Sequence, residues 1–172
     1  MRRILPVLTV SALLIMTLAA PAAATSDARP FKGAASGEVT FPFVGTDVCP
    51  ASDVFAGGLQ TTSLATGTAN HLGAVTMMAR HCTPAADTIA GGQGTFVAAN
   101  GDEIYFDYSG SAPFPGEGTT VIVATTTFEI TGGTGRFADA TGGGELIGYV
   151  TLEGFGDPEW AASWVWSGTI GY

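Results

Sequence analysis

The sequence predicts an all-β protein, a single domain of seven or eight antiparallel strands joined by short turns. After residue 36 no stretch shows a helical pattern of apolar residues, whereas runs rich in Thr, Val, Ile and aromatic residues alternate with turn signals. Gly occurs 25 times and charged residues make up only 12% of the chain, which is typical of short strands joined by tight turns. Such a set of antiparallel strands closes into a barrel or packs as a sandwich, and a long run bent at glycines is what a small closed barrel needs in order to curl.

Residues 1–24 resemble a signal peptide. Two arginines precede the apolar run "ILPVLTVSALLIMTLAA", and Ala22 and Ala24 provide the small residues that a signal peptidase recognises. An uncleaved membrane anchor is the alternative, because the run is nearly long enough to span a bilayer. No charged stop follows it, so we favour cleavage. We therefore expect a protein that is secreted, extracellular or periplasmic, without stable membrane insertion. Residues 25–36 are predicted as a flexible lead-in and residues 37–172 as the barrel domain.

The charge balance argues against a nucleic-acid partner. Cleavage would remove two of the six basic residues and leave all fifteen acidic ones, so the net charge becomes 4 − 15 = −11. Four dispersed basic residues cannot neutralise a row of phosphates. The plain interpretation of the acidity is solubility outside the cell.

Cys49 and Cys82 are the only cysteines. A single pair in an exported chain is most simply a disulfide, and this one would close a loop of 82 − 49 = 33 residues. A catalytic thiol and a metal ligand are the alternatives, since His81 precedes Cys82. We favour the disulfide.

The strands follow one another along the chain. The segments are "GEVTFPF" (37–43), a long run from Leu59 to Cys82 bent at Gly67 and Gly73, a hairpin of 91–99 and 103–110, and three strands within 119–130, 144–156 and 162–172. Asn100-Gly101 predicts a two-residue type I′ turn in the hairpin.

Alternation assigns side chains to faces within two of these strands. Ile104, Phe106 and Tyr108 share one face of their strand, and Trp164 and Trp166 share one face of the last strand. The pattern alone does not determine which face points inward.

The stretch "ITGGTGRFADATG" (130–142) contains Gly133, Gly135 and Ala138 at the spacing of a dinucleotide fingerprint. That chemistry requires a helix to begin at the turn, so that its N-terminus faces the pyrophosphate. Three glycines at 142–144 would break such a helix. We interpret the stretch as a structural turn made by Gly132, Gly133, Gly135, Arg136 and Phe137, with Phe137 entering the core.

The same turn carries a resemblance. "GGTGRF" followed by "ATG", together with "GTANHLGAV" (67–75) and "GTFVAANGDEIYFDYSG" (94–110), is similar to the allene oxide cyclase barrel-like and dirigent-like group, including its bacterial secreted members. The resemblance covers roughly residues 60–172. It implies a single eight-stranded antiparallel β-barrel of calycin-like type with a central cavity, apolar or aromatic ligands, and assembly as a homo-oligomer, by analogy a trimer. It transfers no catalytic residue, because the catalytic sets of that group do not align with this chain.

Few residues suggest chemistry. Asp102, Glu103 and Asp107 form an acidic cluster that is most simply a solvated face. A structural, hydrogen-bonded role is the simplest for His71. Its ten-residue separation from His81 would span about 33 Å in an extended strand, which is too far for one metal site unless the strand folds back. No metal, cofactor or catalytic-triad signature is present. The residues we expect to line the ligand cavity are His71, Tyr105, Asp107, Trp164 and Trp166.

Three functions follow as hypotheses. The first is a secreted barrel that binds a small apolar or aromatic molecule in its cavity. The second is a cyclase or isomerase acting in that cavity through Asp102, Asp107, Tyr105 or His71. The third is a structural or surface-interaction protein whose barrel is filled. The sequence favours binding over catalysis, on the analogy of fold.

Overall fold

The computed structural model describes residues 27–41, 49, 59–84, 87–153 and 159–172. The predicted signal peptide lies outside these residues. The elements are β1 (Arg29–Thr40), β2 (Leu59–Ala69), β3 (Gly73–Thr83), β4 (Thr88–Ala98), β5 (Glu103–Ser111), β6 (Val121–Gly133), a 3₁₀ helix η1 (Gly135–Phe137), β7 (Thr141–Thr151) and β8 (Glu159–Gly171).

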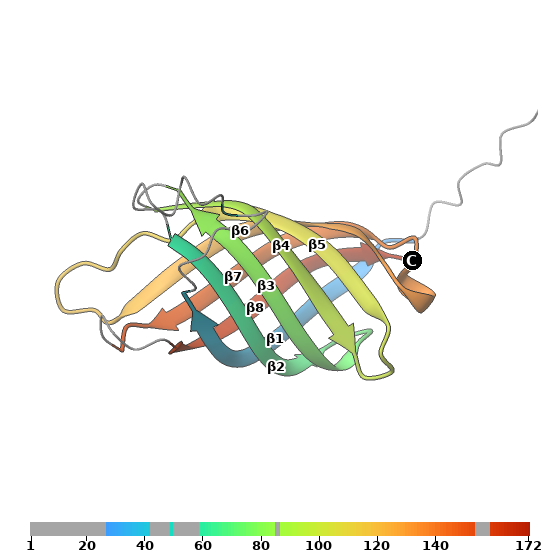
Figure 1. Ribbon diagram of the computed structural model, residues 1–172. Helices are drawn as coiled ribbons and strands as arrows, with labels where there is room; N and C mark the ends of the chain where they lie inside the picture. Colours follow the sequence, from blue (N-terminus) through green and yellow to red (C-terminus); the bar gives the residue numbers. More distant parts are fainter. Residues whose placement is uncertain (1–26, 42–48, 50–58, 85–86, 154–158) are drawn as a thin grey trace, which may run out of the picture.

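The eight strands form a closed antiparallel barrel in sequence order, which confirms the predicted fold (Figure 1). Each strand pairs with the next, and β1 closes the barrel against β8 in a continuous register from Arg29↔Ile170 to Thr40↔Glu159. Closure removes the unpaired strand edges at which open sheets aggregate.

The first strand starts earlier than we predicted. Residues 29–36 belong to β1 and pair with β8, so the prediction of a flexible lead-in is wrong for them. Phe31, Ala35 and Val39 are buried at every fourth position, facing the interior. Small residues at the remaining inward positions, Gly33 and Gly37, obscured the apolar alternation in the sequence.

The long run from Leu59 to Cys82 is two strands rather than one bent strand. Residues 70–72 form the turn between β2 and β3, and the chain folds back there with His71 (φ 68°) and Gly73 (φ 73°) in the left-handed region. Asn70 stabilises the turn, because its side-chain oxygen accepts a 2.6 Å hydrogen bond from the Lys32 N–H of β1. We had interpreted Gly73 as a bend within a strand, whereas it begins β3.

The hairpin of β4 and β5 is present, with a longer loop than predicted. The Gly101 N–H donates to the Ala98 carbonyl at 2.9 Å, and only Gly101 has a positive φ, of 86°. This is a type I turn followed by a left-handed glycine, not a two-residue type I′ turn.

The disulfide between Cys49 and Cys82 is confirmed.

Aromatic side chains fill the interior beside β1, β4, β5, β6 and β8. Phe96 stacks on Phe106 with ring centroids 4.4 Å apart and on Trp166 at 4.7 Å. Phe31 meets Phe96 edge-on at 5.7 Å, and Phe128 meets Phe106 edge-on at 6.0 Å. We call these five residues the aromatic core.

Glycines opposite the aromatic rings make room for this core. A Cβ at Gly33 would lie 2.2 Å from the Trp166 ring, and one at Gly94 would lie 2.1 Å from the Phe106 ring. Gly33 pairs directly with Trp166, and Gly94 with Phe106. Large and small inward residues thus face each other across neighbouring strands, as a small barrel requires.

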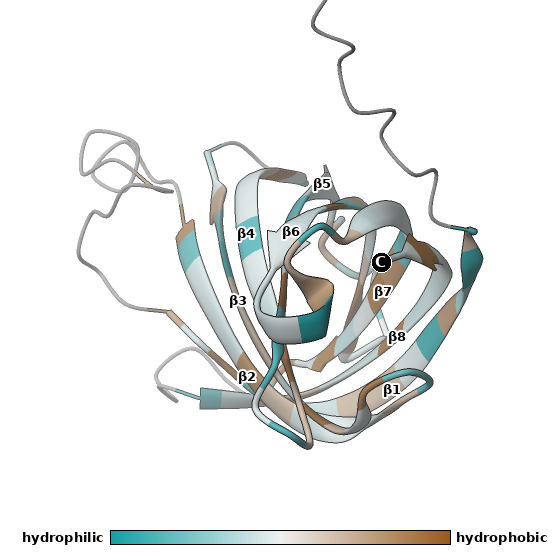
Figure 2. Cartoon of the chain, turned by 90° about the vertical axis from the view of Figure 1, so that its right-hand side faces the viewer, coloured by the Kyte–Doolittle hydropathy of each residue, from teal (hydrophilic) through white to brown (hydrophobic). Residues whose placement is uncertain are grey.

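The turn after β6 closes one end of the barrel. η1 lies across this end, as Figure 2 shows, and its last residue, Phe137, is fully buried. The Phe137 ring packs edge-on against Tyr172 with centroids 4.8 Å apart. Since η1 has only three residues and β7 begins at Thr141, no helix is available at this turn to face a pyrophosphate.

Candidate ligand-binding site

The half of the interior away from η1 is hollow. Its cavity, which we call the cup, has a volume of about 260 Å³ and lies among the strand ends opposite η1. The lining residues are Val39, Phe41, Leu59, Thr61, Ser63, His81, Thr83, Asp87, Ile89, Ala112, Phe114, Ile122, Ala124, Val150, Trp160 and Trp164.

The size of the inward residues explains why this half is hollow. Along β6 the inward positions change from Ile130 and Phe128 at the closed end to Thr126 and Ala124 near the cup. Along β2 the buried positions at the cup are the small residues Thr61 and Ser63. These small side chains leave empty space at the cup, whereas aromatic rings fill the interior at the closed end.

One wall of the cup is apolar. It is formed by Val39 of β1, Ile122 and Ala124 of β6, and the indole rings of Trp160 and Trp164 of β8. The Trp160 ring is held by Phe41, edge-on with centroids 4.7 Å apart. Aromatic and aliphatic side chains of this kind are typical of pockets for small molecules.

The opposite wall, on β2 and β3, carries polar groups. Thr61 pairs directly with His81 across the two strands, and Ser63 is the next inward residue of β2. Thr61 and Ser63 are buried. Asp87 lies nearby, after β3, where its carboxylate accepts a 3.2 Å hydrogen bond from the Phe114 N–H and orders the connection after β5.

His81 connects the cup to its floor. Its Nδ1 lies 2.9 Å from the Tyr108 hydroxyl, and the two rings meet edge-on. A small hollow of about 30 Å³ below the cup is lined by both side chains and by Thr126, Leu146 and Trp164. Thr126 donates from its hydroxyl to the Leu146 carbonyl at 2.7 Å.

Burial controls the protonation of this pair. It lowers the pKa of His81 from 6.5 to about 4, and it raises the pKa of Tyr108 above its ordinary value. At neutral pH both side chains are therefore uncharged. The floor of the cup provides hydrogen-bonding groups without charge.

The low pKa of His81 predicts a loss of stability in mild acid. Above pH 6.5 His81 is neutral in the folded and the unfolded chain, so its full contribution is present. Between pH 6.5 and about 4 the unfolded chain binds a proton that the folded chain does not, and unfolding becomes easier by about 1–3 kcal/mol. Tyr108 and Asp87 are the titratable groups beside it. Urea unfolding at pH 7 and pH 5 measures the difference. The double variant His81→Phe with Tyr108→Phe should lose most of this difference between pH 7 and pH 5. An unchanged difference in the double variant would contradict the attribution to His81.

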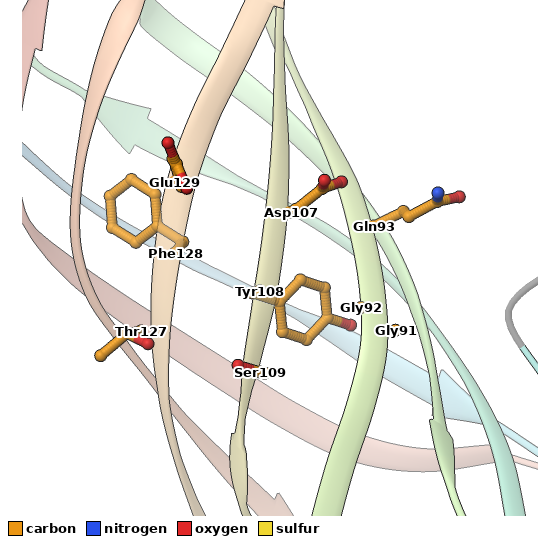
Figure 3. Close-up of a pocket in the computed structure, with 9 residues that line it drawn as sticks. All are labelled: Gly91, Gly92, Gln93, Asp107, Tyr108, Ser109, Thr127, Phe128 and Glu129. Atoms are coloured by element: carbon orange, nitrogen blue, oxygen red, sulfur yellow. The ribbon is translucent and has the colours of Figure 1, made fainter.

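Tyr105 and Asp107 point to the outside of the barrel, so they do not line its interior. Tyr105 is 38% exposed and donates from its hydroxyl to the Glu103 carboxylate at 2.7 Å, a hydrogen bond that raises the pKa of Tyr105. Figure 3 shows Asp107 beside Gln93 and Glu129, on the neighbouring strands β4 and β6. Asp107, Gln93 and Glu129 line a shallow hollow on the outer face of the sheet.

His71 lies at the closed end, away from the cup. Its Nε2 is 2.9 Å from the Pro30 carbonyl, and its Nδ1 is 3.3 Å from the Tyr172 hydroxyl. Arg136 donates to the His71 carbonyl and lies 3.9 Å from the Asp102 carboxylate. These contacts tie three turns and the C-terminal residue together. A structural role accounts for them.

The two predicted tryptophans point inward but differ in role. Trp164 lines the cup, whereas Trp166 belongs to the aromatic core. Sequence reasoning missed His81, Tyr108 and Trp160. Alternation along β3 from Val75 would have placed His81 inward, had the turn at residues 70–72 been recognised.

Comparison with known proteins found no relative: no family model, no curated protein and no solved structure matches the chain. The architecture and the cup therefore carry the functional argument.

None of the helices in the described ranges is both long and apolar enough to cross a membrane. No group of three or more His, Cys, Asp or Glu side chains in that part of the chain is placed to hold a metal ion.

Proposed function

We propose that the protein binds a small apolar or aromatic molecule in the cup. The observation that carries this proposal is a preformed cavity with an apolar wall of two tryptophans and a floor of uncharged polar groups. Among the described residues, Asp87 is the only charged side chain that lines it. Such a cavity gains affinity by removing apolar ligand surface from water.

The volume limits the ligand to a compact molecule. A dry apolar cavity of about 150 Å³ admits benzene. At about 260 Å³ the cup has room for a larger compound, such as a fused bicyclic ring system. The aromatic core beneath it prevents deeper entry.

The proposal includes export and a family relationship. The disulfide is typical of an oxidising compartment, which supports secretion to the periplasm or the medium. The closed eight-stranded barrel and the buried Phe137 of the "GGTGRF" turn support a relationship to the allene oxide cyclase barrel-like group. By that analogy the protein would be a trimer, which its mass in solution, measured by light scattering, would test.

The geometry favours binding over the two other hypotheses. Asp102 and His71 contribute to the closed end, and Tyr105 and Asp107 face outward, so the groups expected to perform cyclase or isomerase chemistry do not converge in the cup. A barrel filled throughout is not what the structure has, since only one half of its interior is occupied by the aromatic core.

Filling the cup is expected to abolish binding. Ala124 lies beside Trp164 and Gly148 on the apolar wall, so Ala124→Phe would place a ring in the cavity. N-phenyl-1-naphthylamine, whose fluorescence increases in apolar sites, serves as the probe. We expect saturable binding to the wild type and at least a tenfold loss of affinity in the variant.

The matched control is Ala161→Phe, on the exposed outer face of β8. It adds the same ring outside the barrel and should leave the affinity unchanged. Thermal unfolding of both variants shows whether they remain folded. No saturable binding to the wild type, or equal loss in both folded variants, would contradict the proposed function.

A further inference from the structure

The cup has a direction, because its polar groups are gathered on one side. His81, Thr61 and Ser63 occupy the β2–β3 wall, and Trp160 and Trp164 stand on the β8 side. A ligand with a polar edge therefore has one preferred orientation. The hydrogen-bonding state of His81 determines what that edge should be.

One ring nitrogen of His81 is left for a ligand. Nδ1 is taken by the Tyr108 hydroxyl, and Nε2 has no hydrogen-bond partner among the residues that the structure describes. Nε2 is also not sealed off, since the only fully enclosed and unpaired side-chain nitrogen or oxygen in those residues is Nε1 of Trp166. Tyr108 borders the hollow below but not the cup, while His81 borders both of these spaces. The side of the imidazole away from Tyr108 thus faces the cup.

The neighbouring tyrosine selects the tautomer. A buried phenol must donate its proton or lose the free energy of a hydrogen bond, and His81 Nδ1 is the acceptor within reach. If Tyr108 donates to Nδ1, the imidazole carries its proton on Nε2. The remaining donor then lies where the cup can supply an acceptor.

We infer that the ligand is an uncharged ring compound with a carbonyl oxygen on one edge, which accepts a hydrogen bond from His81 Nε2–H while the ring lies against Trp160 and Trp164. This inference rests on the proposed function and specifies its ligand class. Thr61 and Ser63 lie beside His81 on the same wall and can provide further hydroxyl donors to the oxygen.

The electrostatics of the site favour a neutral ligand over a carboxylate. The neutral His81 offers no positive charge, and no Lys or Arg lines the cup among the described residues. Asp87 and the acidic chain as a whole would repel an anion. A carbonyl compound accepts the hydrogen bond without this cost.

The test compares two molecules of the same shape. 2-Acetylnaphthalene has the carbonyl, and 2-isopropenylnaphthalene replaces it with a CH₂ group. Each is titrated as a competitor of N-phenyl-1-naphthylamine. The preference is the hydrocarbon's dissociation constant divided by that of the ketone. We expect this preference to be about five- to tenfold larger in the wild type than in His81→Phe combined with Tyr108→Phe, the factor that one hydrogen bond contributes. The second substitution avoids an unpaired buried phenol.

The outcomes separate this inference from the proposed function. Binding of both naphthalenes with the same preference in wild type and variant would overturn the carbonyl assignment and leave the binding function intact. Failure of the wild type to bind any of the three compounds would contradict the binding function itself. If the double variant does not fold, ¹⁵N NMR of wild-type His81 decides. Protonated Nε2 supports the inference, and protonated Nδ1 overturns it.

Discussion

Replacing Phe96 by alanine is expected to lower the free energy of unfolding by about 3–5 kcal/mol, the usual cost of removing a buried phenylalanine ring. Phe96 is fully buried, and it is the residue that stacks on both Phe106 and Trp166 while meeting Phe31 edge-on. Glycines face these rings across the strands, so neighbouring side chains are too few to fill the space that the substitution leaves.

Guanidinium unfolding with linear extrapolation measures this loss. The adjacent Val97, on the outer side of β4, provides the control, and Val97→Ala should cost well under half as much. Equal losses at the two positions would show that the aromatic core does not dominate the stability of the barrel.

Removing the disulfide is expected to cost about 3–4 kcal/mol. The bond between Cys49 and Cys82 spans 33 residues, and the chain-entropy estimate for a closed loop of this length gives that value. The double substitution Cys49→Ala with Cys82→Ala is unfolded in parallel with the wild type. A reducing agent should then destabilise the wild type by a similar amount and leave the double variant unchanged. A reductant effect on the variant would show that the loss has another origin.

Much of the fold was predictable because strands carry a period of two. The alternation of Ile104, Phe106 and Tyr108 against Glu103 and Asp107 is the same in the sequence and in β5. The fold class followed from such segments and from the turns between them. The start of β1 did not, because its inward positions alternate Phe with Gly and Ala, which leaves little apolar contrast.

The turn at residues 70–72 escaped prediction for a different reason. Its left-handed position is occupied by His71 rather than by Asn or Gly, and its stability comes from Asn70 bonding to β1, nearly forty residues earlier. Long-range contacts of this kind leave no local signal. This missed turn mattered, because it determines which residues of β3 face inward.

The candidate site was harder to predict than the fold. Trp164 was chosen as a large aromatic residue in a regular alternation, and it does line the cup. Tyr105 and Asp107 were chosen on the wrong face, because the inward face of a strand is fixed only when the barrel closes. His81 was considered only as a neighbour of Cys82 and as a distant partner of His71. Nothing in the sequence indicated its contact with Tyr108, 27 positions away.

The floor of the cup gives the cavity a fixed depth. Trp164, Tyr108 and Leu146 border the space below it, and the aromatic core fills the barrel from there to η1. A linear chain bound in the cup would gain about 0.8 kcal/mol for each CH₂ group it buries, until its tip reaches this floor. Further carbons would then remain in water and add nothing. Under the proposed function, the filled half of the barrel would act as a molecular ruler, which distinguishes ligands by length as well as by polarity.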